Sequence, residues 1–317
     1  MAVAKLESRT IAVVGAGAVG GLLAAMLAKV GHDVRLLARG AALDAIRARG
    51  IRVRGPDEDD TVSIARVSDD AAGLGAADFV LVTVKTWQLA ELGPRLAPLI
   101  GNRTLVVPMQ NGVEASELLA VALGEQHVIG GVCRMIGWAE RPGEVRWIGF
   151  PPSLTIGPRQ PGQSDDVEAC ATALRLGGVE VLVTRAIDRA RWTKFLFLAP
   201  FAAVGAAARA PIGVLRATPN WRARLLAVMS EVAAVAVARG VELPADAAAT
   251  ALQKLDELPA DATASMHRDI VGGRPSELHE LIGAVVRLGR VAQVPTPASA
   301  ELYAQLEPLE RRARGQG

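Results

Sequence analysis

One lysine stands at the head of a long apolar run, in the segment RWTKFLFLAPFAAVG that begins at Arg191. An ammonium group that is taken out of water costs several kcal/mol of free energy unless it is paired or loses its proton. Lys194 therefore either reaches solvent from a helix surface or lies in a cleft where its charge serves chemistry. An ammonium in such a cleft can stabilise a developing oxyanion and deliver a proton to it.

Two more polar positions follow apolar runs that are typical of buried strands. The segment VLVTVKTWQ contains Lys85 directly after its apolar part, and LVVPMQNGV contains Asn111 before Gly112. Open α/β sheets bind their ligands at the carboxyl ends of the parallel strands, and loops at these edges often carry function. We therefore predict that Lys85 and Asn111 line a ligand site, although a plain surface lysine would also follow a strand.

A glycine-rich turn gives the clearest indication of a ligand. Gly15, Gly17 and Gly20 form GxGxxG directly after the apolar run of residues 10–14 and at the start of a helical pattern. There the first glycine permits a tight turn, the second lets the backbone approach a pyrophosphate, and the third packs the helix against the strand. The pyrophosphate would lie against free N–H groups at the helix start. The predicted dinucleotide-binding loop consists of Gly15, Ala16, Gly17, Ala18, Val19 and Gly20.

The residue after the second strand indicates which dinucleotide is bound. NAD sites place an acidic residue there to hold the ribose 2′-hydroxyl. Here the run VRLLAR ends in Arg39, and Asp33 lies before the strand, at the wrong end to reach the ribose. A guanidinium group suits a 2′-phosphate, so we predict that the cofactor is NADPH. The alternative is that Arg39 is a solvated loop residue.

The order of the apolar runs predicts the elements that position these residues. Up to residue 185, short apolar strands alternate with helical segments, which is typical of a doubly wound, mainly parallel sheet. Residues 51–67 are expected to form paired strands and residues 87–100 one helix. The strands of residues 127–185 are punctuated by glycine and proline, and we expect them to extend the sheet in a more antiparallel manner.

After residue 185 the strand patterns stop. Four helical segments rich in alanine, leucine and arginine follow, the last of them over residues 276–292. We therefore predict an α/β fold with an N-terminal Rossmann-type dinucleotide-binding domain over residues 1–186 and an all-helical substrate and catalytic domain over residues 187–317.

Composition narrows the class of protein. The chain has 317 residues, 50% hydrophobic and 3% aromatic, with a net charge of +2 from 35 basic and 33 acidic residues. A net charge this close to zero implies no polyanionic partner. The small number of aromatic residues gives no support for nucleic-acid binding. The two cysteines have no CxxC spacing, and no metal is predicted. Without a signal-peptide pattern or an uninterrupted span of ~20 apolar residues, we expect a cytoplasmic protein that does not use a membrane.

Five segments together resemble the ketopantoate reductase family, the 2-dehydropantoate 2-reductases: VVGAGAVGG, VKTWQ, QNGV, RWTKF and SMHRDIVGGRPSELHELIG. The resemblance covers nearly the whole chain, including the order of an α/β half and a helical half. It implies an NADP-dependent oxidoreductase in which hydride passes from NADPH to a 2-oxo acid and gives the 2-hydroxy acid. Arg39 matches the arginine of the 2′-phosphate. The implied partner is a small-molecule 2-oxo acid, and the apolar helical half would permit a homodimer.

The resemblance also implies roles for the polar positions. Lys194 matches the catalytic lysine and Glu277 its carboxylate partner, while Ser265 matches a serine that contacts the substrate. Lys85 and Asn111 match residues that line the nicotinamide and the substrate. Alternatives without chemistry exist for two of them. An acidic residue such as Glu277 is favoured in the first turn of a helix, and Ser265 could be a helix cap.

Two positions depart from the family pattern. The family has asparagines four and eight residues after the catalytic lysine, on one face of the helix, whereas this chain has Leu198 and Ala202 there. A leucine cannot replace a hydrogen bond to a substrate hydroxyl, and such bonds discriminate strongly between substrates. We therefore expect a bulkier or less hydroxylated 2-oxo acid than ketopantoate.

Two other functions stay open from the sequence. The same fold could serve a hydroxyacid or opine-type dehydrogenase with a different keto substrate. A cofactor-binding regulator that has lost catalysis would bind NADPH tightly and turn over no 2-oxo acid. The presence of both Lys194 and Glu277 argues against the regulator, since a binding module has little need of a buried charge.

Overall fold

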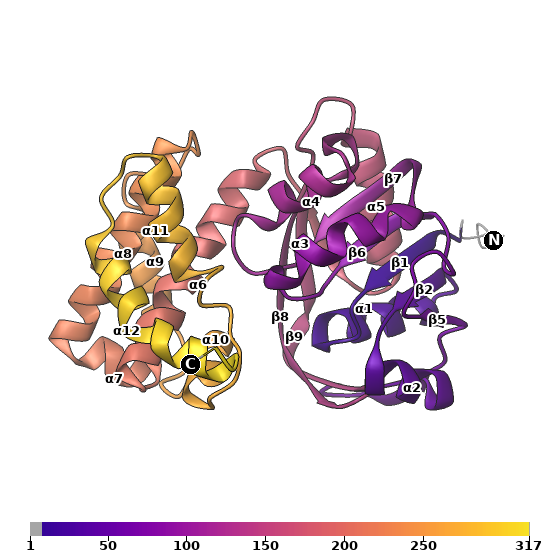
Figure 1. Ribbon diagram of the computed structural model, residues 1–317, viewed down its shortest axis with the longest axis horizontal. Helices are drawn as coiled ribbons and strands as arrows, with labels where there is room; N and C mark the ends of the chain where they lie inside the picture. Colours follow the sequence, from indigo (N-terminus) through magenta and orange to yellow (C-terminus); the bar gives the residue numbers. More distant parts are fainter. Residues whose placement is uncertain (1–7, 317) are drawn as a thin grey trace. The chain divides into compact units, whose positions relative to one another are not determined.

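The computed structural model describes residues 8–316, which divide into two compact units (Figure 1). The α/β unit consists of the chain up to Gln110 together with Ala115–Ile187. The helical unit consists of the chain from Asp188 onward together with Asn111–Glu114. Four residues from the middle of the α/β sequence therefore belong to the helical unit, and Asn111 is one of them.

A parallel sheet forms the centre of the α/β unit. Its five strands are β1 (Thr10–Val14), β2 (Asp33–Leu37), β5 (Arg66–Ser68), β6 (Ala77–Val82) and β7 (Ile100–Pro108). They lie in the order β5-β2-β1-β6-β7, and every pairing is parallel. The central strands are buried almost throughout, as expected of a sheet that is covered on both faces. The predicted doubly wound α/β class is confirmed.

Helices cover the two faces of this sheet. They are α1 (Ala18–Lys29), α2 (Gly40–Arg49), α3 (Leu89–Leu92), α4 (Ala115–Leu123) and α5 (Ser164–Leu176), with a short 3₁₀ turn at Glu125–His127. Because successive side chains of a strand point to opposite faces, Ile11 and Val13 pack with residues of α1 and α5, while Val14 packs with α3 and α4. The glycine loop between β1 and α1 is therefore anchored by buried elements on both sides.

The later strands do not extend the parallel sheet, so that prediction was wrong. The strands β8 (Gly130–Arg141), β9 (Glu144–Gly157) and β10 (Glu180–Val183) instead form a second sheet together with the earlier strands β3 (Ile51–Arg54) and β4 (Asp59–Val62). One edge of β9 pairs antiparallel with β8, and its other edge pairs with β3 near its start and with β10 near its end. The chain just before β8 pairs with β7 through the isolated parallel bridge Val106–Val128.

The expected helix over residues 87–100 is broken into short pieces. A 3₁₀ turn at Thr86–Gln88 leads into α3, and a second 3₁₀ segment covers Gly93–Leu99. Proline lacks an N–H and clashes with the preceding turn of an α-helix. Pro94 and Pro98 therefore prevent a continuous α-helix here.

The helical unit consists of seven helices over the part of the chain that the structure describes. They are α6 (Ile187–Ala208), α7 (Ile212–Ala217), α8 (Pro219–Ala238), α9 (Ala247–Asp256), α10 (Ser265–Val271), α11 (Ile282–Val291) and α12 (Pro297–Ala313). Helices α8, α11 and α12 pack against one another (Figure 1). Their apolar side chains share one core with most of α6. None of the helices in residues 8–316 is long and apolar enough to cross a membrane.

The segment 276–292 was predicted as one helix, but α11 begins only at Ile282. Residues 276–281 form a turn instead, and Glu277 lies in that turn. The alternative explanation of Glu277 as a residue of a helical first turn is therefore wrong. Ser265 is the first residue of α10, and its side chain does not cap that helix.

Candidate active site

The glycine loop after β1 has a geometry that requires two of its glycines. Gly15 adopts a φ of +105°, and its N–H donates to the Leu37 carbonyl at 2.9 Å. The Thr83 hydroxyl donates to the carbonyls of Val14 and Gly15, at 2.9 and 3.1 Å. A Cβ on Gly20 would lie 2.0 Å from the Gly15 carbonyl oxygen and 2.4 Å from the Thr83 hydroxyl. Helix α1 can therefore approach the loop this closely only with glycine at position 20.

The start of α1 is open for an anion. Gly17 is the N-cap residue, it is exposed, and nothing lies within 4 Å of a Cβ built on it. The first helical hydrogen bond runs from the Gly21 N–H to the Gly17 carbonyl, so the N–H groups of Ala18, Val19 and Gly20 have no partner four residues back. No side chain caps this helix start, and its first turn contains no acidic residue. The loop Gly15–Ala16–Gly17 and the start of α1 thus fit a dinucleotide pyrophosphate.

We expect Gly20→Ala to destabilise the α/β unit, because an extra methyl group would overlap the Gly15 carbonyl at 2.0 Å. Overpacking of this kind costs about 1–3 kcal/mol. Gly17→Ala is the matched control, since its Cβ meets open space and its φ of −79° suits alanine. Thermal unfolding followed by circular dichroism should show a clearly lower unfolding temperature for Gly20→Ala and almost no change for Gly17→Ala. Equal unfolding temperatures for both variants would contradict this explanation of the motif.

Arg39 lies at the carboxyl end of β2, beside the glycine loop. It is exposed, it is the N-cap residue of α2, and its side chain makes no hydrogen bond or ion pair with any described residue. The nearest acidic residue before it along the chain, Asp33, lies at the opposite end of β2, where its carboxylate binds the Arg35 guanidinium at 2.9 Å. No acidic residue stands in the first turn of α2. The end of β2 therefore presents a cation and lacks the carboxylate that a ribose 2′-hydroxyl would need.

Lys85 follows β6, the neighbour of β1 in the sheet, so it stands at the same carboxyl edge as the glycine loop. Its backbone is fixed by Gln88, which accepts the Lys85 N–H at 3.1 Å and donates its own N–H to the Lys85 carbonyl at 3.0 Å. The ammonium lies 5.7 Å from the centre of the Trp87 ring. Such a cation–π contact holds the charge of a half-buried lysine near the aromatic ring.

Asn111, Lys194 and Glu277 come together within the helical unit. Lys194 Nζ donates to Asn111 Oδ1 at 2.8 Å, and Asn111 Nδ2 donates to Glu277 Oε2 at 3.3 Å, across separations of 83 and 166 residues along the chain. An ammonium can only donate and a carboxylate can only accept, so one orientation of the amide satisfies both partners. Glu277 is 3% exposed, and Lys194 is half-buried. The three side chains form one hydrogen-bonded row.

Arg191, which the sequence analysis did not single out, ties the Asn111 segment to α6. Its side chain is almost completely buried, and it donates to the Val113 carbonyl and to Asp188 Oδ1, the latter at 2.8 Å. Arg191 and Lys194 are three residues apart and share one face of α6. The same helix therefore holds the Asn111 segment and presents the lysine to it. The signal in the sequence was a second cation one turn before Lys194.

Two further contacts fasten residues 111–114 to the helical unit. Gly112 has a φ of +101°, and a Cβ built on it would lie 3.0 Å from the Glu280 carbonyl oxygen. Arg287 of α11 forms an ion pair with Glu114 at 2.6 Å. Glycine is thus needed at position 112 for the backbone to pass the turn that carries Glu277.

Glu280 is a second carboxyl group in that turn, and it was not among the predicted site residues. Burial raises the pKa of Glu280 above its ordinary value, and the neighbouring charge of Glu277 adds to the rise, whereas Arg314 opposes it. Its Oε2 is buried and has no hydrogen-bond partner among the described residues. The environment thus favours the protonated form of Glu280 more than free solvent does.

The remaining predicted positions of the helical unit differ in exposure. Ser265 is half-buried, and its hydroxyl makes no hydrogen bond to any described residue. Leu198, one turn after Lys194, is half-buried and packs against the helical core. Ala202 is 0% exposed and belongs to that core. Of the two departures from the family pattern, Leu198 retains surface that a substrate could meet.

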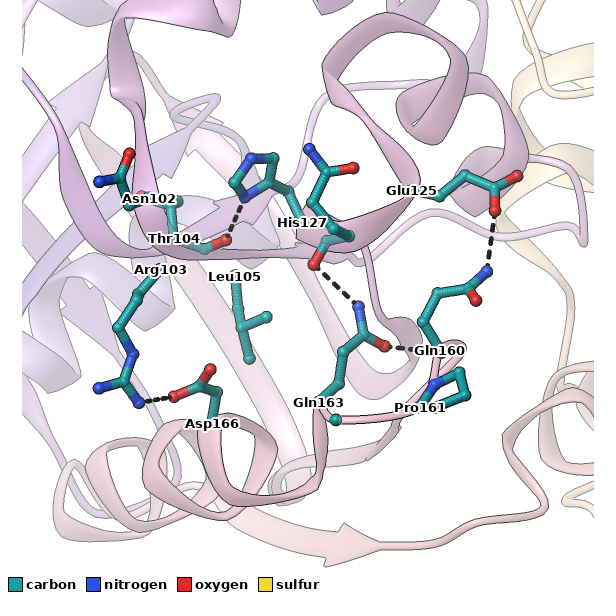
Figure 2. A pocket seen from close by; sticks show the side chains of 12 residues that line it. Asn102, Arg103, Thr104, Leu105, Glu125, His127, Gln160, Pro161, Gln163 and Asp166 are labelled. Atoms are coloured by element: carbon teal, nitrogen blue, oxygen red, sulfur yellow. Dashed lines mark hydrogen bonds and ion pairs between the residues drawn. The ribbon is translucent and has the colours of Figure 1, made fainter.

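A polar hollow of about 480 Å³ lies elsewhere in the α/β unit, at the amino-terminal half of β7 (Figure 2). Its polar groups bind one another: His127 Nδ1 lies 3.0 Å from the Thr104 carbonyl, Gln163 donates to the Gln126 carbonyl, and Gln160 donates to Glu125. None of the predicted site residues lines it. The sheet's carboxyl edge, where ligands of open α/β sheets bind, is at the other end of β7.

Comparison with known proteins agrees with this arrangement. The model of the family described as Ketopantoate reductase PanE/ApbA matches residues 11–161, and that of its C-terminal domain matches residues 186–310. The chain belongs to the ketopantoate reductase family. A 2-dehydropantoate 2-reductase of Mesorhizobium japonicum is 31% identical over 308 residues, which cover 90% of this chain and 93% of the relative.

Solved structures give the same result. A PanE/ApbA family ketopantoate reductase from Ralstonia eutropha JMP134 is 32% identical and superimposes with a TM-score of 0.87, covering 96% of this chain and 99% of that one. A D-mandelate dehydrogenase with NADH and anilino(oxo)acetate superimposes with a TM-score of 0.88 over 96% of this chain and 99% of its own, but at 20% identity it shows the fold alone. The protein is therefore an oxidoreductase of the ketopantoate reductase family that acts on a CH–OH group and its ketone with a nicotinamide dinucleotide.

Proposed function

We propose that this ketopantoate reductase homologue reduces a 2-oxo acid to the 2-hydroxy acid with NADPH, and that Lys194 protonates the ketone oxygen. The observation that carries the proposal is the row Lys194–Asn111–Glu277, in which a half-buried ammonium is bound to an amide that a buried carboxylate orients. A lysine that served only as a surface residue would not need an amide partner from a distant part of the chain that a buried carboxylate in turn orients.

Each member of the row has a distinct task. A nicotinamide dinucleotide held by the glycine loop would supply the hydride for the ketone carbon. Negative charge then grows on the ketone oxygen, where the Lys194 ammonium donates a hydrogen bond and transfers a proton. Asn111 accepts another N–H of that ammonium and so directs it, and Glu277 keeps the Asn111 amide from turning over. After the transfer Lys194 is neutral and regains its proton from solvent.

The substrate carboxylate needs a separate cation, and we assign that task to Lys85. Trp87 keeps the Lys85 ammonium at the sheet edge, 5.7 Å from its ring centre. Ser265, with a half-buried hydroxyl at the start of α10, is proposed to contact the substrate as well.

For the dinucleotide we assign Gly15 to Gly20 to the pyrophosphate and Arg39 to the 2′-phosphate. The free N–H groups at the start of α1 and the cation at the end of β2 support these assignments. Asn111 is also proposed to line the nicotinamide, as the family resemblance implies.

The activity is tested by following the loss of NADPH absorbance with a panel of 2-oxo acids. We expect turnover with at least one of them and formation of one equivalent of 2-hydroxy acid per NADPH oxidised. Tight binding of NADPH without turnover on any member of the panel would overturn the proposal in favour of a regulator.

Leu198 should make the enzyme indifferent to the hydroxyl group of ketopantoate. We expect kcat/KM for ketopantoate to be no higher than for its deoxy analogue, in which a hydrogen replaces the hydroxyl. Leu198→Asn should raise the ratio of kcat/KM for ketopantoate to kcat/KM for the deoxy analogue about tenfold. The reason is that one hydrogen bond to a substrate is worth about 1 kcal/mol or more. Ala202→Gly is the control inside the core, and it should leave the ratio unchanged. A strong preference of the parent enzyme for ketopantoate would contradict this prediction.

A further inference from the structure

The last helix, α12, binds every polar group of the residue that precedes Glu277. The two carboxylate oxygens of Glu310 accept the N–H of Ser276 at 3.0 and 3.1 Å, and Oε2 also accepts the Ser276 hydroxyl. Arg314 donates to the Ser276 carbonyl at 2.9 Å and to Glu310 Oε1 at 2.6 Å. Glu310 and Arg314 are one turn apart on α12, so a single i,i+4 pair holds the N–H, the hydroxyl and the carbonyl of Ser276.

This contact is enclosed by the helical unit. Ser276 is 0% exposed and Glu310 is 1% exposed. Removing a carboxylate from water is costly, so a buried ion pair by itself is weak evidence of a gain in stability. A buried polar network in which every member has its partners does fix one geometry. The position of Ser276 is therefore the property that this pair determines most directly.

The position of the Glu277 side chain depends on that of Ser276, because Glu277 lies in a turn between α10 and α11, outside any helix or strand. Within the turn, the Leu278 N–H donates to the Ser276 hydroxyl at 3.3 Å, and the Leu281 N–H donates to the Glu277 carbonyl at 2.9 Å. A rotation of the Ser276 backbone would therefore move the Glu277 carboxylate away from Asn111.

Helix α12 holds the turn at a second place. The Tyr303 hydroxyl shares a hydrogen bond of 2.6 Å with His279 Nδ1, and Arg287 donates to the His279 carbonyl at 2.7 Å. Tyr303 and Glu310 are seven residues apart, two turns of α12, and so lie on one face of it. The residues on both sides of Glu277 are thus bound from this face.

We propose that Glu310 is a positioning residue of the active site, which with Arg314 holds Ser276 so that the Glu277 carboxylate meets Asn111. The proposal rests on the proposed function, in which Glu277 orients Asn111 and thereby Lys194. It assigns a task in the reaction to a helix that carries none of the residues of the row.

The test replaces the Glu310 carboxylate by an amide. Both oxygens of Glu310 accept from Ser276, so the NH₂ group of Glu310→Gln must face a donor whichever way it turns. We expect kcat to fall about tenfold or more, because small displacements of catalytic groups have effects of this size. The Kd for NADPH should stay within twofold, since the glycine loop belongs to the other unit. Glu307→Gln is the matched control: it makes the same change one turn earlier, in a partly exposed pair with Arg311 at 3.8 Å, and should leave kcat unchanged.

A double-mutant cycle separates positioning from stability. If Glu310 acts through Glu277, then Glu310→Gln should lower kcat about tenfold in the parent but less than twofold in the Glu277→Gln background. Ser276→Ala removes the two hydrogen bonds of the hydroxyl, to Glu310 and from the Leu278 N–H, and serves in the same cycle if Glu310→Gln does not fold. Unfolding temperatures should fall by the same amount in both backgrounds.

Two results would overturn the inference: an unchanged kcat in Glu310→Gln, or an equal loss in both backgrounds, which would make the role purely structural. A Glu277→Gln variant with unchanged kcat would instead refute the role of Glu277 in the proposed function, and the inference with it. The single variants therefore tell the two failures apart.

Discussion

Lys194→Ala is expected to lower kcat by about a thousandfold, because it removes both the proton donor and the charge that stabilises the oxyanion. Each of these effects contributes about 10²–10⁴ in enzymes where it has been isolated, and the two overlap here in one group. The loss should appear in kcat and not in the KM for NADPH, since the interaction strengthens only as charge develops on the ketone oxygen.

The control for this experiment is Lys254→Ala, which removes an exposed lysine from α9 of the same helical unit. It should keep the kcat of the parent. Dinucleotide binding, measured by titration of NADPH fluorescence, should be the same within twofold in both variants. A Lys194→Ala enzyme that retains kcat within threefold of the parent would refute the assignment of Lys194 as proton donor.

The glycine loop shows what the sequence can predict well. Gly15, Gly17 and Gly20 are adjacent in the chain, and the steric requirement that they meet is local: a Cβ at position 20 would lie 2.0 Å from the Gly15 carbonyl. The same holds for the class of the sheet, because buried parallel strands carry continuous apolar runs that can be read without knowing their partners.

The row Lys194–Asn111–Glu277 is the opposite case. Its members are 83 and 166 residues apart, and no periodicity of the sequence brings them together. Only the family resemblance linked these three positions. The resemblance says nothing of Arg191 or Glu310, which look like ordinary surface charges on helices until packing buries them to 5% and 1% exposure.

The errors in the predicted elements have similar causes. The helix expected from residue 276 begins only at Ile282, and the polar groups of Ser276 bind Glu310 and Arg314 of α12. The antiparallel strands form their own sheet because β9 pairs with three partners along its length, and β3 comes from a distant part of the chain. Local sequence patterns identify strands, but they do not show which strands will pair with one another.

Arg39→Ala is expected to raise the Kd for NADPH about 10- to 100-fold and to leave that for NADH within about twofold. Hydrogen bonds to a charged group are worth about 1.5–3 kcal/mol, and the 2′-phosphate is the only group that distinguishes the two dinucleotides. Arg39 is also the N-cap residue of α2, whose first turn contains no acidic residue, so the helix start adds to the attraction for an anion there. Both constants can be measured by fluorescence titration at one salt concentration.

Arg49→Ala serves as the control, because it removes an exposed arginine from the last turn of the same helix and changes the net charge equally. It should leave both constants unchanged, which excludes a general effect of charge on dinucleotide binding. If Arg39→Ala raised the Kd for NADPH and the Kd for NADH equally, the guanidinium would contact a part that the two dinucleotides share. Arg39→Asp supplies the stronger version of the test: an acid at the end of β2 can accept from the ribose 2′-hydroxyl and repels a 2′-phosphate, so the preference should reverse toward NADH. Such a reversal would show that the residue after β2 alone decides between the two dinucleotides.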